Sequence, residues 1–351
     1  MERKLASIQQ IADVQPIEGA DSIEVATVLG WQCVVNKGEF KVNDLCVFFE
    51  PDAVLPEWPE FEFMRRYYYE NNFVGVKGFR IKTIKLRKQI SQGLAMPLLA
   101  FKACEEGLLH RMEIGADVTS LFEIRKYEPP EPSEPGAQIA GGTKGNWPEF
   151  LSKTDETRIQ AVPSLLEKHR GEAFFVTEKL DGTSFTAYLK DGNFGICSRN
   201  NEIRTDSETV YAKIARELEL EAKLRSLSLY NVAIQGEIVG PGIQKNKYKL
   251  DEHRLYVFSL LNLNDRSLYA PEEQYRMISD IGLLHVPYLS MNILEYTLQE
   301  LVDVSVGYSA LYETQREGLV FRPCTPQYSQ KLGGHLSFKV INPKFLLKHD
   351  E

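Results

Sequence analysis

The sequence predicts an α+β protein of two domains. Residues 5–125 contain short β-prone runs separated by Gly, Asn and Asp turns, and a proline-rich stretch follows them. The remaining residues mix β-prone runs with segments of helical periodicity. We therefore expect an N-terminal β domain over residues 1–127, a linker over 128–145 and a second domain over 146–351. A chain of 351 residues is of ordinary length for two domains.

The expected elements follow from local patterns. In the first domain, strands are clearest at residues 31–35 and 45–49, and residues 97–112 are expected to be at least partly helical. In the second domain, apolar residues at helical spacing predict one helix over about 206–226, capped by Asp206 or Ser207. Pro271, with two glutamates directly after it, predicts the start of another helix over 271–281.

Composition favours a protein of the reducing cell interior. Apolar residues make up 43% of the chain, but no apolar run approaches the roughly 20 residues of a membrane span. Residues 1–7 lack the apolar stretch of a secretory signal. Five cysteines are dispersed at positions 33, 46, 104, 197 and 324 without a Cys-x-x-Cys pair, which argues against structural zinc. We expect an intracellular, cytoplasmic protein with no membrane partner.

A basic segment contrasts with the overall net charge of −8. Six basic residues and no acidic one lie between Lys77 and Lys88. If residues 80–83 form a strand, their alternation of basic and uncharged side chains puts the charges on one face. That face is either simply solvated or contacts a phosphate backbone. On the second interpretation, the candidate nucleic-acid contacts are Arg80, Lys82, Lys85 and Arg87.

The most informative stretch is Glu178-Lys-Leu-Asp-Gly-Thr, which ends a β-prone run over 173–177. A lysine amine has a reference pKa of about 10.4 and becomes a nucleophile only after losing its proton. Burial, nearby cations or a bound metal favour the neutral amine. Lys179 is therefore a candidate covalent nucleophile for phosphoryl-type transfer, which otherwise requires positioning and neutralisation of phosphate charge.

Further motifs follow Lys179 in a fixed order, each at the edge of a β-prone segment. They contain Arg199 in Ser-Arg-Asn, Glu237 in Gly-Glu-Ile-Val-Gly, Phe258, Glu317 in Glu-Gly, and Lys339. Each motif alone has an ordinary interpretation as a turn, strand end, core aromatic or surface lysine. Their ordered occurrence favours side chains that converge from a sheet on one pocket.

The chemistry of these side chains suggests their roles. Mg²⁺ and Mn²⁺ prefer hard oxygen ligands, so either cation could be held, directly or through its waters, by Asp181, Glu237 and Glu317. An aromatic such as Phe258 could stack on a nucleobase. Arg199 could donate to a sugar or a phosphate, and Lys339 could lie against a triphosphate.

This ordered set resembles the motifs of the covalent nucleotidyltransferase superfamily, which contains ATP-dependent DNA and RNA ligases and mRNA capping enzymes. The resemblance implies that Lys179 is the adenylated lysine and that the catalytic residues are Lys179, Glu237, Glu317 and Lys339. It implies that ATP is bound by Arg158, Glu178, Lys179, Arg199, Glu237, Phe258 and Lys339. Residues 153–160 are similar to a segment of RNA ligases in which the arginine, here Arg158, touches the leaving pyrophosphate.

The N-terminal third is similar to the OB domain of RNA ligase family 5. Residues 17–26, 30–35, 50–56, 78–87 and 91–94 carry this similarity. Together the resemblances cover about residues 5–350 and include the domain order. They imply an N-terminal OB-fold β-barrel followed by a ligase-type nucleotidyltransferase domain built on antiparallel sheets with flanking helices.

One position departs from the pattern of these relatives. Many of them have two lysines separated by one residue in the last motif, whereas Ser337 stands two residues before Lys339 here. Lys331 lies a few residues upstream. The sequence does not identify the second cation that meets the phosphates.

The resemblance implies that the protein is an ATP-dependent RNA ligase that uses Mg²⁺ or Mn²⁺. Such an enzyme would join 3′-hydroxyl and 5′-phosphate ends at nicks in duplex RNA. The reaction would pass through lysyl-AMP and RNA-adenylate intermediates. We expect a monomer whose partner is RNA. Motif spacing does not identify the nucleobase, so an ATP-dependent DNA ligase or a capping-type guanylyltransferase remains open. A nucleic-acid-binding protein that has lost catalysis is the alternative from another class, and the intact lysines and glutamates argue against it.

Overall fold

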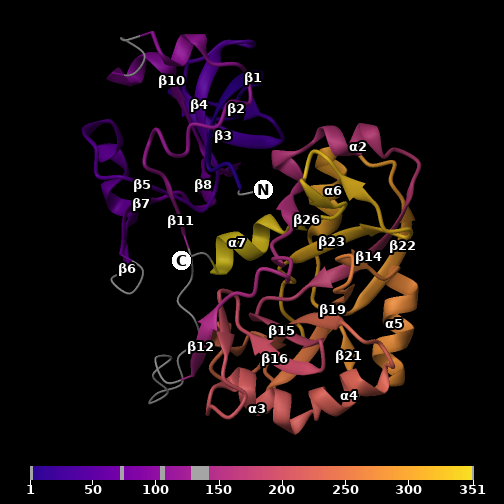
Figure 1. Ribbon diagram of the computed structural model, residues 1–351. Coiled ribbons are helices and arrows are strands. Elements are labelled where there is room, and N and C mark those ends of the chain that lie inside the picture. Colours follow the sequence, from indigo (N-terminus) through magenta and orange to yellow (C-terminus); the bar gives the residue numbers. More distant parts are fainter. Residues whose placement is uncertain (1–2, 72–74, 103–106, 128–141, 350–351) are drawn as a thin grey trace. The chain divides into compact units, whose positions relative to one another are not determined.

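The computed structural model describes residues 3–71, 75–102, 107–127 and 142–349 (Figure 1). The chain forms two compact units. The N-terminal unit comprises Met1–Pro129, Ile159–Leu165 and Pro343–Glu351, and the C-terminal unit comprises Pro130–Arg158 and Leu166–Asn342. Most of the linker expected over 128–145 lies outside the described residues, and its last residues enter strand β12 (Thr143–Asn146).

Antiparallel strands dominate the N-terminal unit. They are β1 (Ala6–Pro16), β2 (Ile23–Val28), β3 (Trp31–Asn36), β4 (Leu45–Phe49), β5 (Ala53–Leu55), β6 (Tyr68–Asn71), β7 (Val76–Arg80), β8 (Ile84–Leu86), β9 (Gln89–Ser91), β10 (Leu94–Pro97) and β11 (Arg125–Lys126). One sheet has the order β10-β4-β1-β2-β3 and another has β11-β5-β7-β6, while β8 and β9 form a separate hairpin. The strands expected at 31–35 and 45–49 are confirmed as β3 and β4.

Aromatic packing fills the core of this unit. The ring of Phe49 on β4 meets the rings of Phe61 and Phe122 edge-on, at centroid distances of 5.4 and 5.5 Å. All three side chains are buried. Such edge-to-face pairs add to the free energy gained from burying their large apolar area.

Helical structure in the N-terminal unit is short. Its 3₁₀ turns are η1 (Pro59–Tyr67), η2 (Leu98–Ala100), η3 (Leu109–Arg111) and η5 (Ile159–Ala161), and its C-terminal segment forms α7 (Pro343–His349). Helix α2 (Ser164–Lys168) spans the boundary between the units in sequence. Within the described part of residues 97–112, the helical expectation is met by η2, by Lys102 and by η3.

The C-terminal unit contains the remaining elements. Its strands are β12, β13 (Thr157–Arg158), β14 (Ala173–Lys179), β15 (Thr183–Lys190), β16 (Asn193–Cys197), β17 (Asn201–Ile203), β18 (Val232–Val239), β19 (Arg254–Asn262), β20 (Ser267–Leu268), β21 (Leu284–His285), β22 (Tyr288–Ile293), β23 (Gly318–Pro323), β24 (Tyr328–Ser329), β25 (Gly334–His335) and β26 (Phe338–Ile341). Its helices are α3 (Val210–Glu217), α4 (Leu220–Ser226), α5 (Pro271–Asp280), α6 (Leu298–Ser305) and the 3₁₀ turn η6 (Gln244–Asn246).

Two largely antiparallel sheets organise this unit. The first has the order β12-β17-β16-β15-β18-β19-β20, with β21 also paired to β19. The second has the order β13-β26-β23-β14-β22. A large core cluster joins the first sheet to α3, α4 and α5, through residues such as Ile214, Leu224 and Ile278 packed with Ile234. The predicted α+β class with flanking helices is therefore confirmed.

The helix expected over 206–226 is two helices. Glu219 separates α3 from α4 in the left-handed region, with φ of 49°. In one continuous helix, Leu220 would be rotated away from the face that Val210 and Ile214 bury, because successive residues turn by about 100°. The break lets Leu220 and α4 return to the core. The cap is also wrong, since Thr209 accepts the hydrogen bond from the Ala212 amide.

The helix expected at 271–281 is confirmed as α5, which starts at Pro271 with Glu272 and Glu273 in its first turn. Among the helices that the structure describes, none is long and apolar enough to cross a membrane.

Candidate active site

Lys179 and Glu317 lie side by side at the point where strand β14 ends and its neighbour β23 begins. Lys179 is the last residue of β14, and its register partner on β23 is Gly318. Glu317 directly precedes β23, so its carboxylate lies beside the lysine, and Lys179 Nζ donates to Glu317 Oε2 at 2.8 Å. The two side chains are 24% and 15% exposed, so the ion pair is largely withdrawn from water.

Two motif glycines allow strands to approach closely. A Cβ at Gly182 would lie 2.2 Å from the carbonyl oxygen of Ile238 on β18. A Cβ at Gly318 would lie 2.2 Å from the carbonyl oxygen of Val340 on β26. Both contacts are impossible for a larger residue without backbone movement. The Asp-Gly and Glu-Gly pairs are therefore packing requirements as well as turn residues.

Glu237 lies across from the lysine motif on β18. Its Oε1 accepts a hydrogen bond from the Gly182 amide at 3.0 Å. Burial raises the pKa of Glu237 to about 8, with Lys179 opposing and Glu317 adding to the rise. Glu237 is thus a carboxylate whose charged form needs a cation nearby.

Lys179 differs from the sequence-based expectation of a readily neutral amine. Burial lowers the pKa of Lys179, but the carboxylates of Glu317, Glu237 and Asp181 outweigh burial, and the pKa is raised. The protein alone therefore holds the lysine as an ammonium. Added positive charge on those carboxylates would shift the balance toward the nucleophilic amine.

Asp181 is held by groups that the sequence did not single out. Its backbone amide donates to the Tyr248 hydroxyl at 2.8 Å. Its carboxylate forms an ion pair with Lys247. Both partners come from the loop between β18 and β19, and only the concentration of lysines in Lys245-Asn-Lys-Tyr-Lys249 could have drawn attention to it.

Glu178 points to the other side of β14. The side chain is 1% exposed, and Oε2 accepts from the Ala310 amide at 2.8 Å. Burial raises the pKa of Glu178, opposed by the hydrogen bonds from Ser309 and Ala310. Glu178 thereby ties the loop that leads to Glu317 to the strand that carries Lys179.

Phe258 sits at a bulge in β19. The register with β18 shifts between Gln235 and Gly236, so that Phe258 is the extra residue while Val257 and Ser259 remain paired. A bulge of this kind re-aims a side chain out of the regular alternation. Unlike its buried neighbours, Phe258 is half-exposed. The sequence identified the aromatic but contained no sign of the bulge.

Arg322 and Gln274 support Phe258, and the sequence analysis missed both. The Phe258 carbonyl accepts hydrogen bonds from Gln274 Nε2, at 3.0 Å, and from an Arg322 guanidinium nitrogen. The guanidinium lies 5.5 Å from the Phe258 ring centroid. Arg322 also pairs with Glu156 at 2.6 Å. Arg322, Gln274 and Thr177 line one pocket.

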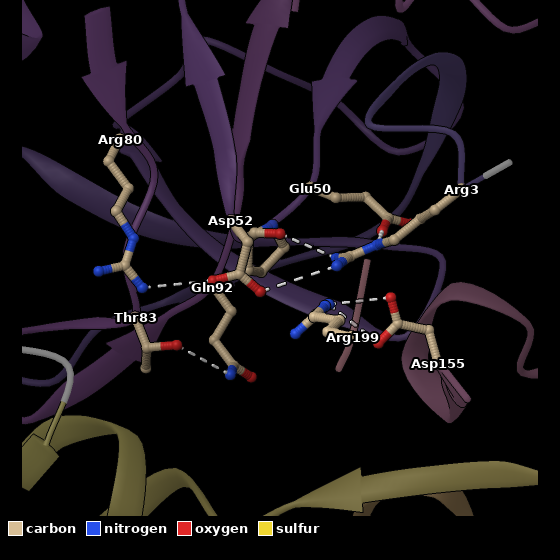
Figure 2. Close-up of polar contacts among 9 residues, drawn as sticks. Arg3, Glu50, Asp52, Arg80, Thr83, Gln92, Asp155 and Arg199 are labelled. Carbon is tan, nitrogen blue, oxygen red and sulfur yellow. Dashed lines mark hydrogen bonds and ion pairs between the residues drawn. The ribbon is translucent and has the colours of Figure 1, made fainter. Parts of the chain in front are cut away.

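The segment over 153–158 connects the two sheets. Arg199 pairs with Asp155 at 3.0 Å, as Figure 2 shows. Thr154 hydrogen-bonds Ser184 on β15 at 3.1 Å. At the other end, Arg158 on β13 is the parallel register partner of Lys339 on β26. The structure therefore brings Arg158 and Lys339 side by side on the sheet that carries Lys179.

Lys339 reaches the same electrostatic cluster. Its charge acts on Glu317, whose pKa is raised chiefly by burial and lowered in part by Lys179 and Lys339. Two residues from Lys339 on either side lie Ser337, which directly precedes β26, and Ile341, the last residue of β26, and both are buried and neutral. Lys331 is exposed between β24 and β25.

The acidic residues fit a hard divalent cation held through water. Within the described ranges, no three His, Cys, Asp or Glu side chains form a ready-made metal-binding group. Asp181, Glu237 and Glu317 nevertheless interact electrostatically around Lys179. Carboxylate oxygens are the donors that Mg²⁺ and Mn²⁺ prefer, and Mg²⁺ usually keeps several of its waters. These three residues would hold such a cation, which supplies positive charge near phosphates.

The basic segment of the N-terminal unit is only partly as expected. Strand β7 ends at Arg80, so residues 80–83 do not form a strand with both charges on one face. Arg80 is 8% exposed and pairs with Asp52 at 3.4 Å, as Figure 2 shows. The Arg80 guanidinium carbon lies 3.4 Å from the Tyr127 ring centroid.

Other cations of this segment face solvent. Lys82 is half-buried, whereas Lys85 and Arg87 are exposed. Arg87 and Lys88 form the two-residue turn of the β8–β9 hairpin, with φ of 47° and 69°. Such positive-φ turns favour Asn-Gly, so two basic residues there carry a conformational cost.

Comparison with known proteins gives a consistent result. A model of the RNA ligase family matches residues 172–341, and a model of an OB-fold domain matches residues 5–98. The chain is 34% identical to Naegleria gruberi RNA ligase over 99% of both chains, with a TM-score of 0.89 to a mutant apo form. The TM-score is 0.88 both to a mutant with AMP and Mn and to the ligase with PPi. The OB-fold prediction is confirmed. Among curated proteins, none matches the chain.

Proposed function

Because the chain belongs to the RNA ligase family and is an ATP-dependent RNA ligase, we propose that it joins 3′-hydroxyl and 5′-phosphate ends at nicks in duplex RNA. One observation carries the proposal. Lys179, a nucleophile candidate, lies 2.8 Å from Glu317 and interacts electrostatically with Asp181 and Glu237. This arrangement suits nucleotidyl transfer to lysine with a divalent cation present.

In the first step, Lys179 Nζ attacks the α-phosphorus of ATP. A P–N bond forms, the bond to the leaving pyrophosphate breaks, and lysyl-AMP results. The ammonium must first lose a proton, and Glu317 Oε2 is the acceptor to which it already donates. Mg²⁺ or Mn²⁺ supplies positive charge that stabilises the phosphates when it is bound.

The second and third steps use the same site. An oxygen of the RNA 5′-phosphate attacks the adenylate phosphorus, the P–N bond breaks, and Lys179 leaves as RNA-adenylate forms. The RNA 3′-hydroxyl then loses its proton to water and attacks the 5′-phosphate phosphorus, a phosphodiester forms, and AMP leaves. Lys179 is free again at the end of the cycle.

Nucleotide contacts are assigned from the surroundings of each residue. Phe258 would stack on adenine, with its carbonyl fixed by Arg322 and Gln274. Arg158 and Lys339, paired in register, would meet the phosphates. Arg199 would exchange its ion pair with Asp155 for the ribose or a nearby phosphate. Glu178 would support the site by holding the loop at Ala310.

RNA contacts are assigned to the exposed cations of the N-terminal unit. Lys85 and Arg87 on the β8–β9 hairpin, with the half-buried Lys82, would contact the phosphate backbone and recognise helix shape more than sequence. The strained basic turn supports this role, because Asn-Gly would form the turn at lower cost. Arg80 would instead hold its own unit together.

The cysteines support a proposal for the cellular compartment of the enzyme. Cys33, Cys46, Cys197 and Cys324 are free, and burial raises the pKa of Cys46 to about 12. Unreactive, unpaired thiols suit a reducing compartment. We propose a monomeric enzyme of the cytoplasm.

Nick sealing tests the proposal. The purified chain is incubated with ATP, Mg²⁺ or Mn²⁺, and a duplex whose nick carries a labelled 5′-phosphate. We expect sealing when the 3′-hydroxyl side ends in ribose, and none with GTP. Equal sealing of an all-DNA nick would point to a DNA ligase. Transfer of GMP to an RNA 5′-end would point to a capping enzyme.

A further inference from the structure

The phosphate end of the site lacks a second lysine on β26. The residues two before and two after Lys339 are Ser337 and Ile341, which are buried and neutral. Lys331 is exposed in the turn between β24 and β25. A triphosphate carries several negative charges, and its transfer needs cations around it. A second cation for the phosphates therefore has to come from another strand or loop around Lys179.

Lys247 lies beside one of the carboxylates proposed for the metal. Its ammonium forms an ion pair with the carboxylate of Asp181, and the two side chains are only 11% and 17% exposed. Asp181 lies two residues after Lys179, and its carboxylate helps to raise the pKa of Lys179. Lys247 therefore joins the same group of charges as the nucleophile, although it is 68 residues further along the chain.

The loop that carries Lys247 is rigidly built. Asn246 and Leu250 exchange two hydrogen bonds, of 2.8 and 3.1 Å, on either side of Lys247. Tyr248 is buried and binds the Asp181 amide. Gln244, Lys245 and Asn246 all have positive φ, between 45° and 60°. Strained backbone held by many contacts is typical of a segment that must place one side chain accurately.

We propose that Lys247 is the second phosphate-binding lysine of this ligase, and that it occupies the Asp181 carboxylate until a divalent cation takes its place. This proposal rests on the proposed function, because it assumes ATP and a divalent cation in the same site. Lys247 supplies from the β18–β19 loop the charge that many relatives place beside the last-motif lysine.

Electrostatics requires the exchange. Asp181 carries one negative charge, and a divalent cation next to it repels the Lys247 ammonium at contact distance. Displacement removes the Asp181 carboxylate from a largely buried ammonium, and a new anion offsets that loss. The phosphates of ATP, drawn to the same cation, provide that anion. Lys247 therefore opposes metal binding when nucleotide is absent and favours nucleotide binding when metal is present.

The test measures binding, without turnover, in Lys247→Met. Mn²⁺ alone is titrated into the nucleotide-free protein, and free Mn²⁺ is followed by electron paramagnetic resonance. We expect Mn²⁺ to bind about threefold to tenfold more tightly than to the parent, because a charged competitor is gone. The non-transferable ATP analogue with an α,β-methylene bridge, in saturating Mn²⁺, should bind about tenfold to hundredfold more weakly, as expected for losing one charge-assisted hydrogen bond.

Lys249→Met is the matched control. Lys249 is exposed in the same loop and has a positive φ of 52°. Both affinities should stay at the parent values in this variant. Lys247→Arg keeps the charge and should recover part of the analogue affinity. Circular dichroism melting of each variant checks that the fold is retained.

The opposite direction of the two shifts is what a merely structural role would not produce. Mn²⁺ affinity that is unchanged or weaker in folded Lys247→Met, or unchanged analogue affinity, would overturn the proposal. A parent protein that forms no lysyl-AMP would instead refute the proposed function, and that assay uses the parent alone, without any Lys247 variant.

Discussion

The candidate active site and the basic hairpin of the N-terminal unit use charge in opposite ways. In the active site, cations and carboxylates from different strands and loops pair with one another, as Lys179 does with Glu317, Lys247 with Asp181 and Arg322 with Glu156. On the β8–β9 hairpin, Lys85, Arg87 and Lys88 face solvent. Paired and largely buried charges depend on one another, whereas exposed ones act nearly independently.

This difference predicts how substitutions behave. Removal of one partner of an active-site ion pair leaves the other charge largely buried and uncompensated. Substitutions there should therefore have large and non-additive effects on activity. Removal of an exposed cation on the hairpin should weaken RNA binding modestly and in a salt-dependent way. Arg80 separates the two kinds of behaviour, because it belongs to the basic segment in sequence but is buried like the paired charges of the active site.

The largest effect is expected for Glu317→Gln. This change removes the oxygen to which Lys179 donates and one of the three carboxylates proposed for the metal. We expect the rate of lysyl-AMP formation to fall by about 10²–10⁴-fold. Single-turnover adenylylation on denaturing gels measures this rate. Glu313→Gln, an exposed residue of the same loop, should behave like the parent.

A smaller loss is expected for Arg322→Met. The change breaks the ion pair with Glu156 and the hydrogen bond to the Phe258 carbonyl, so the aromatic loses its support. The KM for ATP should rise by about tenfold, as for one lost charge-assisted bond, with a smaller change in kcat. The exposed Arg276 on α5 provides the control, as Arg276→Met. A change in kcat alone would contradict the assignment.

Arg80→Met should affect stability more than RNA binding. It removes the ion pair with Asp52 and the contact with the Tyr127 ring. We expect the free energy of unfolding to fall by about 1–3 kcal/mol. Urea unfolding measures it, and Lys77→Met on the exposed side of β7 should change it little. An RNA-binding defect in folded Arg80→Met without loss of stability would restore Arg80 as a direct contact.

The smallest effect is expected at the hairpin turn. The double variant Arg87→Asn, Lys88→Gly installs the residues that a positive-φ two-residue turn prefers. Stability should be equal or slightly higher, while RNA affinity falls severalfold. The slope of log affinity against log salt should become shallower by about 0.9, as for loss of the phosphate contact assigned to Arg87. Filter binding at several salt concentrations provides both numbers, and an unchanged slope would remove the hairpin from the RNA interface.

Much of the fold was predictable because local patterns agree with the tertiary structure. Strands β3 and β4 and helix α5 follow from β-prone composition and from Pro271 at a helix start. The break at Glu219 was not predictable from apolar spacing, because it arises from where Leu220 must pack. The inward turn of Arg80 depends on Asp52 and Tyr127, which are distant in sequence.

The candidate site shows the same limit. Motif order identified Lys179, Glu237 and Glu317, because each sits at a strand edge with a glycine beside it or nearby. The supporting residues cannot be recognised from the sequence, because their contacts depend on the tertiary structure. Phe258 is aimed by a bulge in register, and Lys247 reaches Asp181 from a loop whose own motif is only a run of lysines.

Covalent labelling shows whether Lys179 is the residue that accepts AMP. The parent and Lys179→Ala are incubated with α-³²P-labelled ATP or GTP and Mg²⁺ or Mn²⁺, then run on a denaturing gel. We expect label on the parent with ATP, none with GTP, and none on Lys179→Ala. Folded parent protein that retains no label with ATP, or Lys179→Ala that labels like the parent, would contradict this expectation.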